Sequence, residues 1–554
     1  MLAWRVHCRR HGCSGGDLGK RLKRAATIVA KRDASTRVAT GEWIASVGLE
    51  VHAQLNTEAK LFSGAATAFG APTNENVAHL DCSLPGTLPV LNQGCVAKAL
   101  LAAQALHCRI NSISRFERKH YFYADIPAGY QITQQRRAFA NDGFLDYYMH
   151  DTILYATEPE EARRSCPLRR TQISQIQMEQ DSGRSIHDPA EQRTLVDLNR
   201  CGVPLIEIIT AADLSSGLEA FCFVKELQSL LARIDVCDGH MEKGHLRVDA
   251  NVSIRRSETD PLGVRTEVKN INSAKHIRKA VDYEIGRHVK LLSAGFEVVN
   301  ETRGYDSVAQ RTVEMRDKEV KQDYRYMFEP NLPPLRLLPG EVEEARRRVE
   351  ALQPPFRQQW IDLYGVSPVE AIFIDDDDDL RAYFAACVDQ LRSSSSHLIP
   401  DTLTRFLLRL LRFSLREANK PVAHSSFSVE DLVALVRLAG AQRLTDEAAQ
   451  YIIVTRLGMA GEGALPSIEE SASSFQRILD ESQIDDVCAS LLDAFPAKLL
   501  RKTRGELSRG EADGKGMAKL VRRALQSPEC GFRIASEDIR KSLCRLLSSP
   551  AAAD

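Results

Sequence analysis

The chain has 554 residues, of which 44% are hydrophobic, and Lys+Arg 73 against Asp+Glu 74 gives a formal net charge of -1. This length suffices for three or four globular domains of roughly 150 residues each. The balanced charge excludes a global basic excess, so any nucleic-acid contact must come from a local basic surface. No apolar run approaches the roughly 20 residues that cross a bilayer, so we expect no membrane span.

The first forty residues are unusually basic. Their only acids are Asp17 and Asp33, against ten cations: Arg5, Arg9, Arg10, Lys20, Arg21, Lys23, Arg24, Lys31, Arg32 and Arg37. This composition is typical of an organellar presequence, and the scarcity of serine favours a mitochondrion, with a plastid as the other possibility. A disordered basic tail without a targeting role is the alternative. In either case we expect residues 1–40 to be disordered and to lie outside the fold.

The clearest strand pattern lies in residues 47–55, where apolar and polar side chains alternate. The alternation places Glu50 and His52 on one face of a strand, while Leu49 and Val51 enter the core. A carboxylate and an imidazole two residues apart on a strand can share one ion.

The same alternation returns in residues 247–254 and 264–269, and each run carries an acid, Asp249 or Glu267, on its polar face. The intervening residues 257–263 are rich in turn formers, which predicts an antiparallel hairpin. Asp249 and Glu267 are then expected on adjacent strands.

Helical patterns interrupt these strands. Residues 95–107 are rich in Ala and Leu, and residues 217–234 carry apolar side chains at helical spacing. The sequence therefore predicts an α+β domain with an antiparallel sheet over residues 41–340.

Residues 115–131 combine cations and aromatic rings without helical amphipathicity. Cations such as Lys119 can bind phosphate, and rings such as Tyr121 and Tyr123 can stack on a base. An edge strand and turn with ordinary surface charge is the alternative for this segment.

Two more acids stand out in strand-like segments. Glu179 lies in the alternating run 175–181, and Glu207 is a lone acid in the almost continuously apolar run 198–209. A carboxylate in such surroundings is costly to bury unless it is paired or bound to metal.

Six side chains from strand-like segments could therefore converge on one sheet face: Glu50, His52, Glu179, Glu207, Asp249 and Glu267. Oxygen ligands with one imidazole favour Mg²⁺ or Mn²⁺ over zinc. The alternative is structural ion pairing with Arg247, Arg265 and Lys269. The chain has no P-loop and no dinucleotide-binding glycine fingerprint, so nucleotide binding needs another scaffold.

Beyond residue 340 helical periodicity dominates, and we expect a helical domain at 341–480 and a tail at 481–554. The tail carries a cluster of cations, Lys515, Lys519, Arg522 and Arg523, on a predicted helix. Such a surface suits RNA phosphates, whereas a merely solvated helix face is the alternative.

Six segments together resemble the B-subunit family of the glutamyl-tRNA(Gln)/aspartyl-tRNA(Asn) amidotransferases, the GatCAB enzymes, and most closely the mitochondrial type. They are Val47–His52, Tyr121–Pro127, Val196–Arg200, Arg247–Ser253, Glu267–Ser273 and Gln322–Tyr326. The resemblance covers nearly everything after the basic N-terminal segment.

The resemblance implies that the chain uses ATP and Mg²⁺, or Mn²⁺, to activate the side-chain carboxylate of misacylated Glu-tRNA(Gln) as an acyl phosphate. Ammonia from an amidase-family A subunit would then form the amide, with a small C subunit completing the heterotrimer. It also implies a cradle around an antiparallel sheet, similar to glutamine synthetase, and a YqeY-like tRNA-binding tail.

Carried over by position, the family pattern assigns catalytic roles to Glu50, His52, Glu179 and Glu207. It assigns metal binding to these four together with Gln180, Asp249 and Glu267, and substrate or ATP binding to Lys119, Tyr121, Tyr123, Asn251 and Lys269. Lys515, Lys519, Arg522 and Arg523 would bind tRNA. Gln180 departs from the acid of bacterial members, from which we expect either weaker metal binding there or greater reliance on Glu207 and His52.

Two other interpretations stay open on the sequence. The chain could be a noncatalytic tRNA-binding scaffold if Gln180 marks a lost metal site. It could also be a GatE-type subunit of a two-subunit enzyme, although the inserted domain usual in that type is not recognisable.

Overall fold

The computed structural model describes residues 43–150, 166–315, 323–352, 356–364, 366–375, 377–392, 403, 407, 411, 415, 427–458, 466–509, 514–527 and 529–548. The predicted presequence lies outside these residues. The chain divides into two units, Met1–Gln353 and Pro354–Asp554. In the part of the chain that is described, none of the helices combines the length and the apolar character that a bilayer crossing requires.

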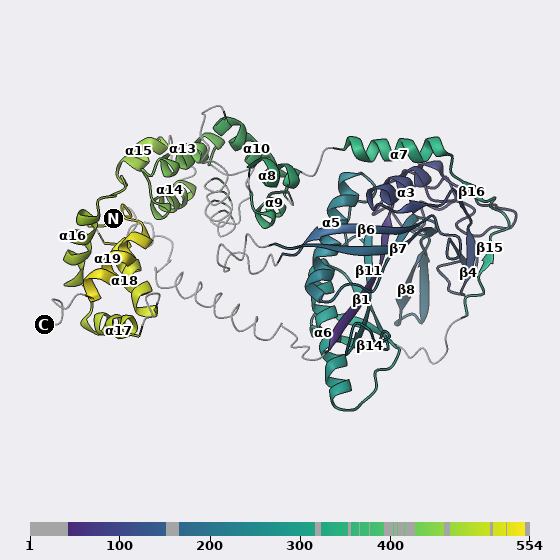
Figure 1. Cartoon of the computed structure of the whole chain (residues 1–554). Helices are drawn as coiled ribbons and strands as arrows, with labels where there is room; N and C mark the ends of the chain where they lie inside the picture. The colour runs from purple at the N-terminus through teal and green to yellow at the C-terminus, as the bar shows by residue number, and fades with distance from the viewer. Residues whose placement is uncertain are drawn as a thin grey trace. The chain divides into compact units, whose positions relative to one another are not determined.

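The first unit is built on a mostly antiparallel sheet, in which nine described strands follow the order β14-β13-β12-β11-β1-β10-β7-β6-β2 (Figure 1). Of the neighbouring pairs, β12 and β13 run parallel and the others antiparallel. The strands are β1 (Ile44–Gln54), β2 (Arg109–Ile110), β6 (Ala140–Tyr148), β7 (Leu168–Gln180), β10 (Pro204–Thr210), β11 (Leu246–Arg255), β12 (Thr266–Ile271), β13 (Thr302–Asp306) and β14 (Arg311–Glu314).

Side-chain alternation gives the central strands one apolar and one polar face. Val51, Ile208 and Val248 are buried on the apolar face, and helices α5 (Gly217–Arg233) and α6 (Ala274–Ser293) belong to the same core. Figure 1 shows both helices along one side of the sheet, with the strands β4 (Glu117–His120), β8 (Arg184–Asp188) and β15 (Met327–Phe328) on the opposite side. The predicted hairpin is confirmed as β11 and β12, and the predicted helix at 217–234 as α5.

A second, smaller sheet stands beside the end of β7. It consists of β15 (Met327–Phe328), β4 (Glu117–His120) and β5 (Tyr130–Thr133). The Gln131 side-chain amide donates to the Gln180 carbonyl at 2.7 Å, and Gln134 accepts from the Met178 amide at 3.0 Å. These bonds join β5 and its following turn to the strand that carries Glu179. Two-stranded pairs complete the unit: β16 (Leu335–Arg336) with β3 (Ile113–Ser114), and β8 (Arg184–Asp188) with β9 (Arg193–Asp197).

A buried ion pair fastens the long loop after β1. Lys60 is fully buried, and its ammonium donates to Asp81 at 2.9 Å and to the carbonyls of Asn76 at 2.7 Å and Leu198 at 3.3 Å. Because a buried charge needs a partner, removing either member would leave the other uncompensated. The pair therefore ties this loop to the segment that leads into β10.

The first unit extends past the predicted domain boundary at 340. Helix α7 (Pro339–Ala351) packs against α3 (Gln93–Ala105), and Ala345 belongs to the core of the first unit. Because α7 buries its apolar side on α3 rather than on the following helices, it belongs to the first unit, which ends at Gln353. The predicted helix at 95–107 corresponds to α3.

The second unit is helical in all the elements described, as the sequence predicts. Its helices are α8 (Phe356–Tyr364), α9 (Pro368–Asp375), α10 (Asp378–Arg392), α13 (Val429–Gly440), α14 (Asp446–Gly458), α15 (Ile468–Ser473), α16 (Glu481–Leu492), α17 (Ala497–Leu507), α18 (Lys515–Leu525) and α19 (Ser536–Ser548). Two apolar clusters stabilise it, one spanning Trp360 to Ala472 and one spanning Ile484 to Leu547.

Candidate active site

The polar face of the central sheet gathers side chains from five strands. On β1, His52 lies opposite Glu207 of β10 and Arg247 of β11, while Glu50 lies opposite Asp249 of β11. Cross-strand partners project on the same face, so the antiparallel register brings these groups together. Residues far apart in the chain thus share one surface.

His52, Glu179 and Glu207 form the tightest group on this face. The His52 Nε2 atom lies 3.2 Å from Glu179 Oε1 and 3.9 Å from Glu207 Oε1. One potential ligand atom from each residue lies within 4.8 Å of the other two, a spacing that can hold a metal ion. Among the residues described, this is the group of His, Cys, Asp or Glu side chains that meets this spacing.

Neutral side chains fix the two carboxylates from the far side. Thr133 of β5 donates to Glu179 Oε2 at 3.2 Å, and the Gln177 amide donates to Glu207 Oε2. Gln177 lies directly opposite Glu207 in the β7–β10 register. In each carboxylate, one oxygen therefore accepts a hydrogen bond from a neutral side chain while the second oxygen faces His52.

Proton affinities in the group are shifted by burial and by the neighbouring charges. Burial alone would lower the pKa of His52, but the hydrogen bond and charge of Glu179, and then the charge of Glu207, raise it to about 9. Burial opposes ionisation of Glu179 as well, yet the bond to His52 and its charge hold the pKa of Glu179 below its usual value. Burial and the charge of Glu179 raise the pKa of Glu207. At neutral pH the group accordingly holds a proton on His52.

A second group lies farther along the same face. The Lys269 ammonium lies 2.9 Å from Asp249 Oδ2 and 2.9 Å from Glu267 Oε1. The register of β11 and β12 shifts between Val248 and Ala250, and such a bulge re-aims the side chains beside it. Asp249 and Glu267 are therefore ion-paired with Lys269, as the alternative interpretation of the sequence predicts.

Glu50 stands between the two groups. It lies opposite Asp249 in the register and accepts a hydrogen bond from the Asn251 amide at 2.9 Å. Asn251 in turn lies opposite Glu267. The five acids and the imidazole therefore lie on one face, as two groups joined by Glu50.

Gln180 does not join them. Alternation along β7 directs its side chain to the face opposite Glu179, because consecutive strand residues point to opposite sides. Its described hydrogen bond is made by the backbone carbonyl, which accepts from Gln131. The expectation that Gln180 is a metal ligand is therefore not supported by this geometry, and an acid at that position would point the same way.

Of the residues assigned to substrate binding, Lys119 and Tyr121 border the His52 group, whereas Asn251 and Lys269 contact Glu50 and the second group. Lys119 lies close enough that its charge helps lower the pKa of Glu179, after the stronger influence of His52. Tyr121 donates to Gln131 Oε1 at 3.3 Å, and its ring lies 5.8 Å from that of Tyr123. Tyr121 thus lies beside the carboxylates, and Tyr123 lies beside Tyr121 and is exposed.

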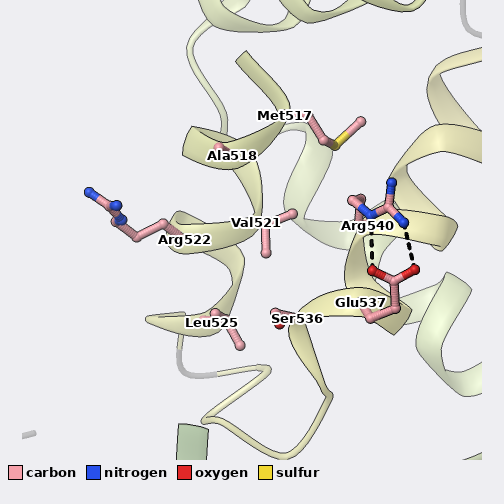
Figure 2. A pocket seen from close by; sticks show the side chains of 8 residues that line it. All are labelled: Met517, Ala518, Val521, Arg522, Leu525, Ser536, Glu537 and Arg540. Carbon is pink, nitrogen blue, oxygen red and sulfur yellow. Dashed lines mark hydrogen bonds and ion pairs between the residues drawn. The ribbon is translucent and has the colours of Figure 1, made fainter. Parts of the chain in front are cut away.

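In the second unit, the predicted RNA-binding cations Lys515, Lys519, Arg522 and Arg523 all lie on α18, where none of them is buried. The apolar side of this helix is buried through Met517 and Leu520. Figure 2 shows Arg522 extending away from the groove between α18 and α19, whereas Arg540 of α19 pairs with Glu537 at 2.5 Å. The cations of α18 are arranged as a surface that anionic ligands can reach.

Sequence reasoning gave no role to several residues that shape the site. Gln177 and Thr133 hold the carboxylates, and Asp181 pairs with Arg247 at 3.0 Å and with Arg200 at 3.3 Å. Gln177 and Asp181 alternate in phase with Glu179, and this spacing indicates that all three side chains lie on the same face of the strand. Nothing in the sequence pattern pairs Thr133 with Glu179, because that contact depends on how β5 packs on β7.

Comparisons with known proteins agree on one family. The GatB/GatE catalytic domain matches residues 45–343. The B subunit of the mitochondrial glutamyl-tRNA(Gln) amidotransferase of Drosophila melanogaster is 39% identical over 505 residues, covering 87% of this chain and 94% of the relative. The Homo sapiens protein of the same name is 36% identical, covering 94% of this chain and 93% of the relative.

A bacterial relative gives a similar match. The B subunit of the aspartyl/glutamyl-tRNA(Asn/Gln) amidotransferase of Xanthobacter autotrophicus is 36% identical, covering 83% of this chain and 89% of the relative. The matches run through both units rather than the sheet alone. The chain therefore belongs to the GatB/GatE family.

Proposed function

We propose that this chain is the B subunit of a glutamyl-tRNA(Gln) amidotransferase, a ligase that forms a carbon–nitrogen bond with glutamine as the amido donor. It would activate the glutamyl side-chain carboxylate of misacylated Glu-tRNA(Gln) at the expense of ATP, and ammonia would then displace the phosphate to give Gln-tRNA(Gln). The observation that carries this proposal is the meeting of His52, Glu179 and Glu207 on the sheet of a GatB/GatE-family chain.

The chemistry explains why such a site needs both acids and cations. A carboxylate is a poor acyl donor, and transfer of a phosphoryl group to it supplies a leaving group. Lys119 and Arg247 border the acids and can neutralise phosphate oxygens, while the pairing of Arg247 with Asp181 fixes its position. The residues of this face thus orient two anionic substrates that would otherwise repel each other.

The donor set fits a hard divalent cation. Two carboxylates and one imidazole within 4.8 Å of one another suit Mg²⁺ or Mn²⁺, and Glu50 offers a further carboxylate on the same face. A bound divalent ion supplies charge neutralisation on a transferring phosphoryl group. His52 must give up its proton to bind the ion, and Gln177 and Thr133 hold the outer carboxylate oxygens in place.

The relatives' names also support a location and an assembly for this chain. We propose mitochondrial translation as its setting, with an amidase-family A subunit supplying ammonia and a small C subunit completing the complex. We propose that the first unit is a glutamine-synthetase-like cradle and that residues 481–554 are a YqeY-like tail. The cations of α18 would bind tRNA phosphates.

Glu179→Gln in the reconstituted complex tests the proposal. The substitution keeps the shape but removes the charge that faces His52, so we expect ATP-dependent formation of Gln-tRNA(Gln) to fall by at least about a hundredfold while tRNA binding is kept. Glu297→Gln is the matched control, because Glu297 is an exposed acid outside the site. Normal amidation by the Glu179 variant would instead favour a noncatalytic tRNA-binding scaffold.

A further inference from the structure

A chain of four tyrosine rings borders the carboxylates. Tyr121 lies edge-on to Tyr123 at 5.8 Å and to Tyr324 at 6.4 Å, and Tyr324 lies edge-on to Tyr326 at 6.0 Å. We call Tyr121, Tyr123, Tyr324 and Tyr326 the tyrosine wall. It joins two segments that are distant in the sequence, so its assembly is a property of the fold and not of one motif.

The backbone is shaped to present these rings. The His120 amide donates to the Tyr324 carbonyl at 2.9 Å, which lays the second segment beside the first. Arg325, between the two later tyrosines, has a φ of 47°, a left-handed conformation that costs a non-glycine residue on the order of 1 kcal/mol. The Asp323 carboxylate accepts from the Arg325 amide at 3.0 Å and supports this turn.

The wall adjoins the acids. Tyr121 is linked through Gln131 to the backbone of β7 next to Glu179. Burial and then the charge of Glu179 raise the pKa of Tyr121, and burial and then the charge of Glu207 raise that of Tyr326. A ligand lying on the rings therefore has its other end within reach of the carboxylates.

Part of the wall is open to solvent. The Tyr123 side chain is 63% exposed and that of its neighbour Phe122 is 86% exposed, so neither serves the core. Phe122 packs over Gly129, where a Cβ atom would lie 3.2 Å from the ring and φ is +73°. Exposed rings held in fixed positions are typical of a binding surface.

We propose that the tyrosine wall stacks on the adenine base of an adenosine nucleotide whose reacting end lies at Glu179 and Glu207. Flat π-faces bind bases by stacking, and the Lys119 ammonium, 4.9 Å from the centre of the Tyr324 ring, stands where the attached phosphate would be neutralised. The inference rests on the proposed function, in which two substrates carry adenosine: ATP and the 3′ end of the aminoacyl-tRNA.

Tyr123→Ala, in the complex with the partner subunits, tests the inference and separates the two sources. The dissociation constant for ADP is measured without tRNA, and the KM for Glu-tRNA(Gln) is measured at saturating ATP. We expect one of the two constants to rise by about 5- to 100-fold. A rise in the ADP constant identifies the base of ATP, and a rise in the tRNA KM identifies the terminal adenosine.

Two further variants decide whether stacking is responsible. Tyr123→Phe keeps the ring, so the affected constant should stay within about twofold of the wild-type value. Phe296→Ala removes a ring that is 65% exposed elsewhere in the unit and should change neither constant. Unchanged constants in Tyr123→Ala and Tyr324→Ala, with normal thermal unfolding, would overturn the inference.

The outcome also distinguishes this inference from the proposed function. If the wild-type complex amidates Glu-tRNA(Gln) and the alanine variants bind both substrates normally, only the inference fails. If the wild-type complex binds ADP through the wall and forms no amide, only the proposed activity fails.

Discussion

At the scale of single residues, His52 is the group on which the site's charge state depends. Its imidazole lies between Glu179 and Glu207, whose negative charges keep it protonated until the pH approaches about 9. A metal ion bound as proposed would need the neutral imidazole, so metal and proton would compete for the same nitrogen. Without a metal ion, the protonated imidazole of His52 supplies the positive charge between the two carboxylates.

This competition gives a pH dependence with a definite sign. We expect the affinity for Mn²⁺ to rise by up to about tenfold per pH unit as the pH increases toward 9, because fewer imidazoles then need to lose a proton. Electron paramagnetic resonance of free Mn²⁺ measures this affinity in the intact complex. In His52→Asn the remaining pH dependence should be weak, and a pH-independent affinity in the wild type would exclude His52 as a ligand.

At the scale of secondary-structure elements, a buried polar network joins helix α6 to strands β13 and β14. Glu284 is fully buried and accepts from Arg287 at 2.9 Å and from Thr312, and it lies 3.4 Å from Arg303. Burial opposes its ionisation, but hydrogen bonds from His288, Thr312 and Arg287 outweigh burial and lower the pKa of Glu284. The charged network therefore holds the helix on this edge of the sheet.

Glu284→Gln should destabilise the first unit by about 3 kcal/mol, because it removes the buried charge that faces the partly buried guanidinium groups of Arg287 and Arg303 and leaves them with Glu301 as their ionic partner. Since the folded-state pKa of Glu284 is lowered, its stabilisation is present above the unfolded value of 4.5 and is lost as the pH falls below it. Urea unfolding at several pH values should show a shallower loss of stability in acid for the variant.

The matched control for that comparison is Glu343→Gln on α7. Glu343 is an exposed acid paired with Arg346, and a surface pair of this kind should show no measurable change. Equal acid sensitivity of the wild type and Glu284→Gln would contradict a role for Glu284 in acid unfolding.

The elements were predictable from the sequence, whereas their register was not. Alternation in residues 47–55 and the turn at 257–263 indicated β1 and the β11–β12 hairpin, because local periodicity reports local structure. Periodicity carries no information on which strand pairs with which, so the contact of His52 with Glu179 could be proposed but not deduced. The register shift between β11 and β12 that accompanies the Lys269 pairing also had no local signature.

The remaining differences have separate causes. Gln180 was grouped with the ligands by its place in a motif, but the strand period directs it to the opposite face. Tyr324 and Tyr326 were part of a recognised motif without an assigned role, because their partners Tyr121 and Tyr123 lie in a distant segment. The first unit extends beyond residue 340 because α7 packs on α3.

At the scale of the whole molecule, acidic and basic functions are divided between the two units. The acids gather in the first, and α18 of the second presents Lys515, Lys519, Arg522 and Arg523 to solvent. Helices α16 to α19 share one apolar cluster, so deleting part of the tail would expose its core. Substitution of the α18 cations is therefore the sharper test.

Replacing Lys519, Arg522 and Arg523 with Gln should raise the KM for tRNA, with a smaller effect on the KM for ATP. Removal of one phosphate contact should reduce the slope of log affinity against log salt by about 0.9 in duplex regions. Filter binding of tRNA over a series of salt concentrations measures this slope. Arg347→Gln on α7 controls for removal of an exposed cation, and an unchanged slope in the triple variant would show that α18 does not bind the tRNA.

The two ends of the acidic face hold different counterions. At one end the counterion is the proton on His52, and at the other it is the Lys269 ammonium, which is paired with Asp249 and Glu267. A proton on His52 can diffuse away, whereas the Lys269 ammonium is tethered to its strand and competes at a high effective concentration. Any soluble cation entering that end must therefore overcome a competitor that dilution and dialysis do not remove.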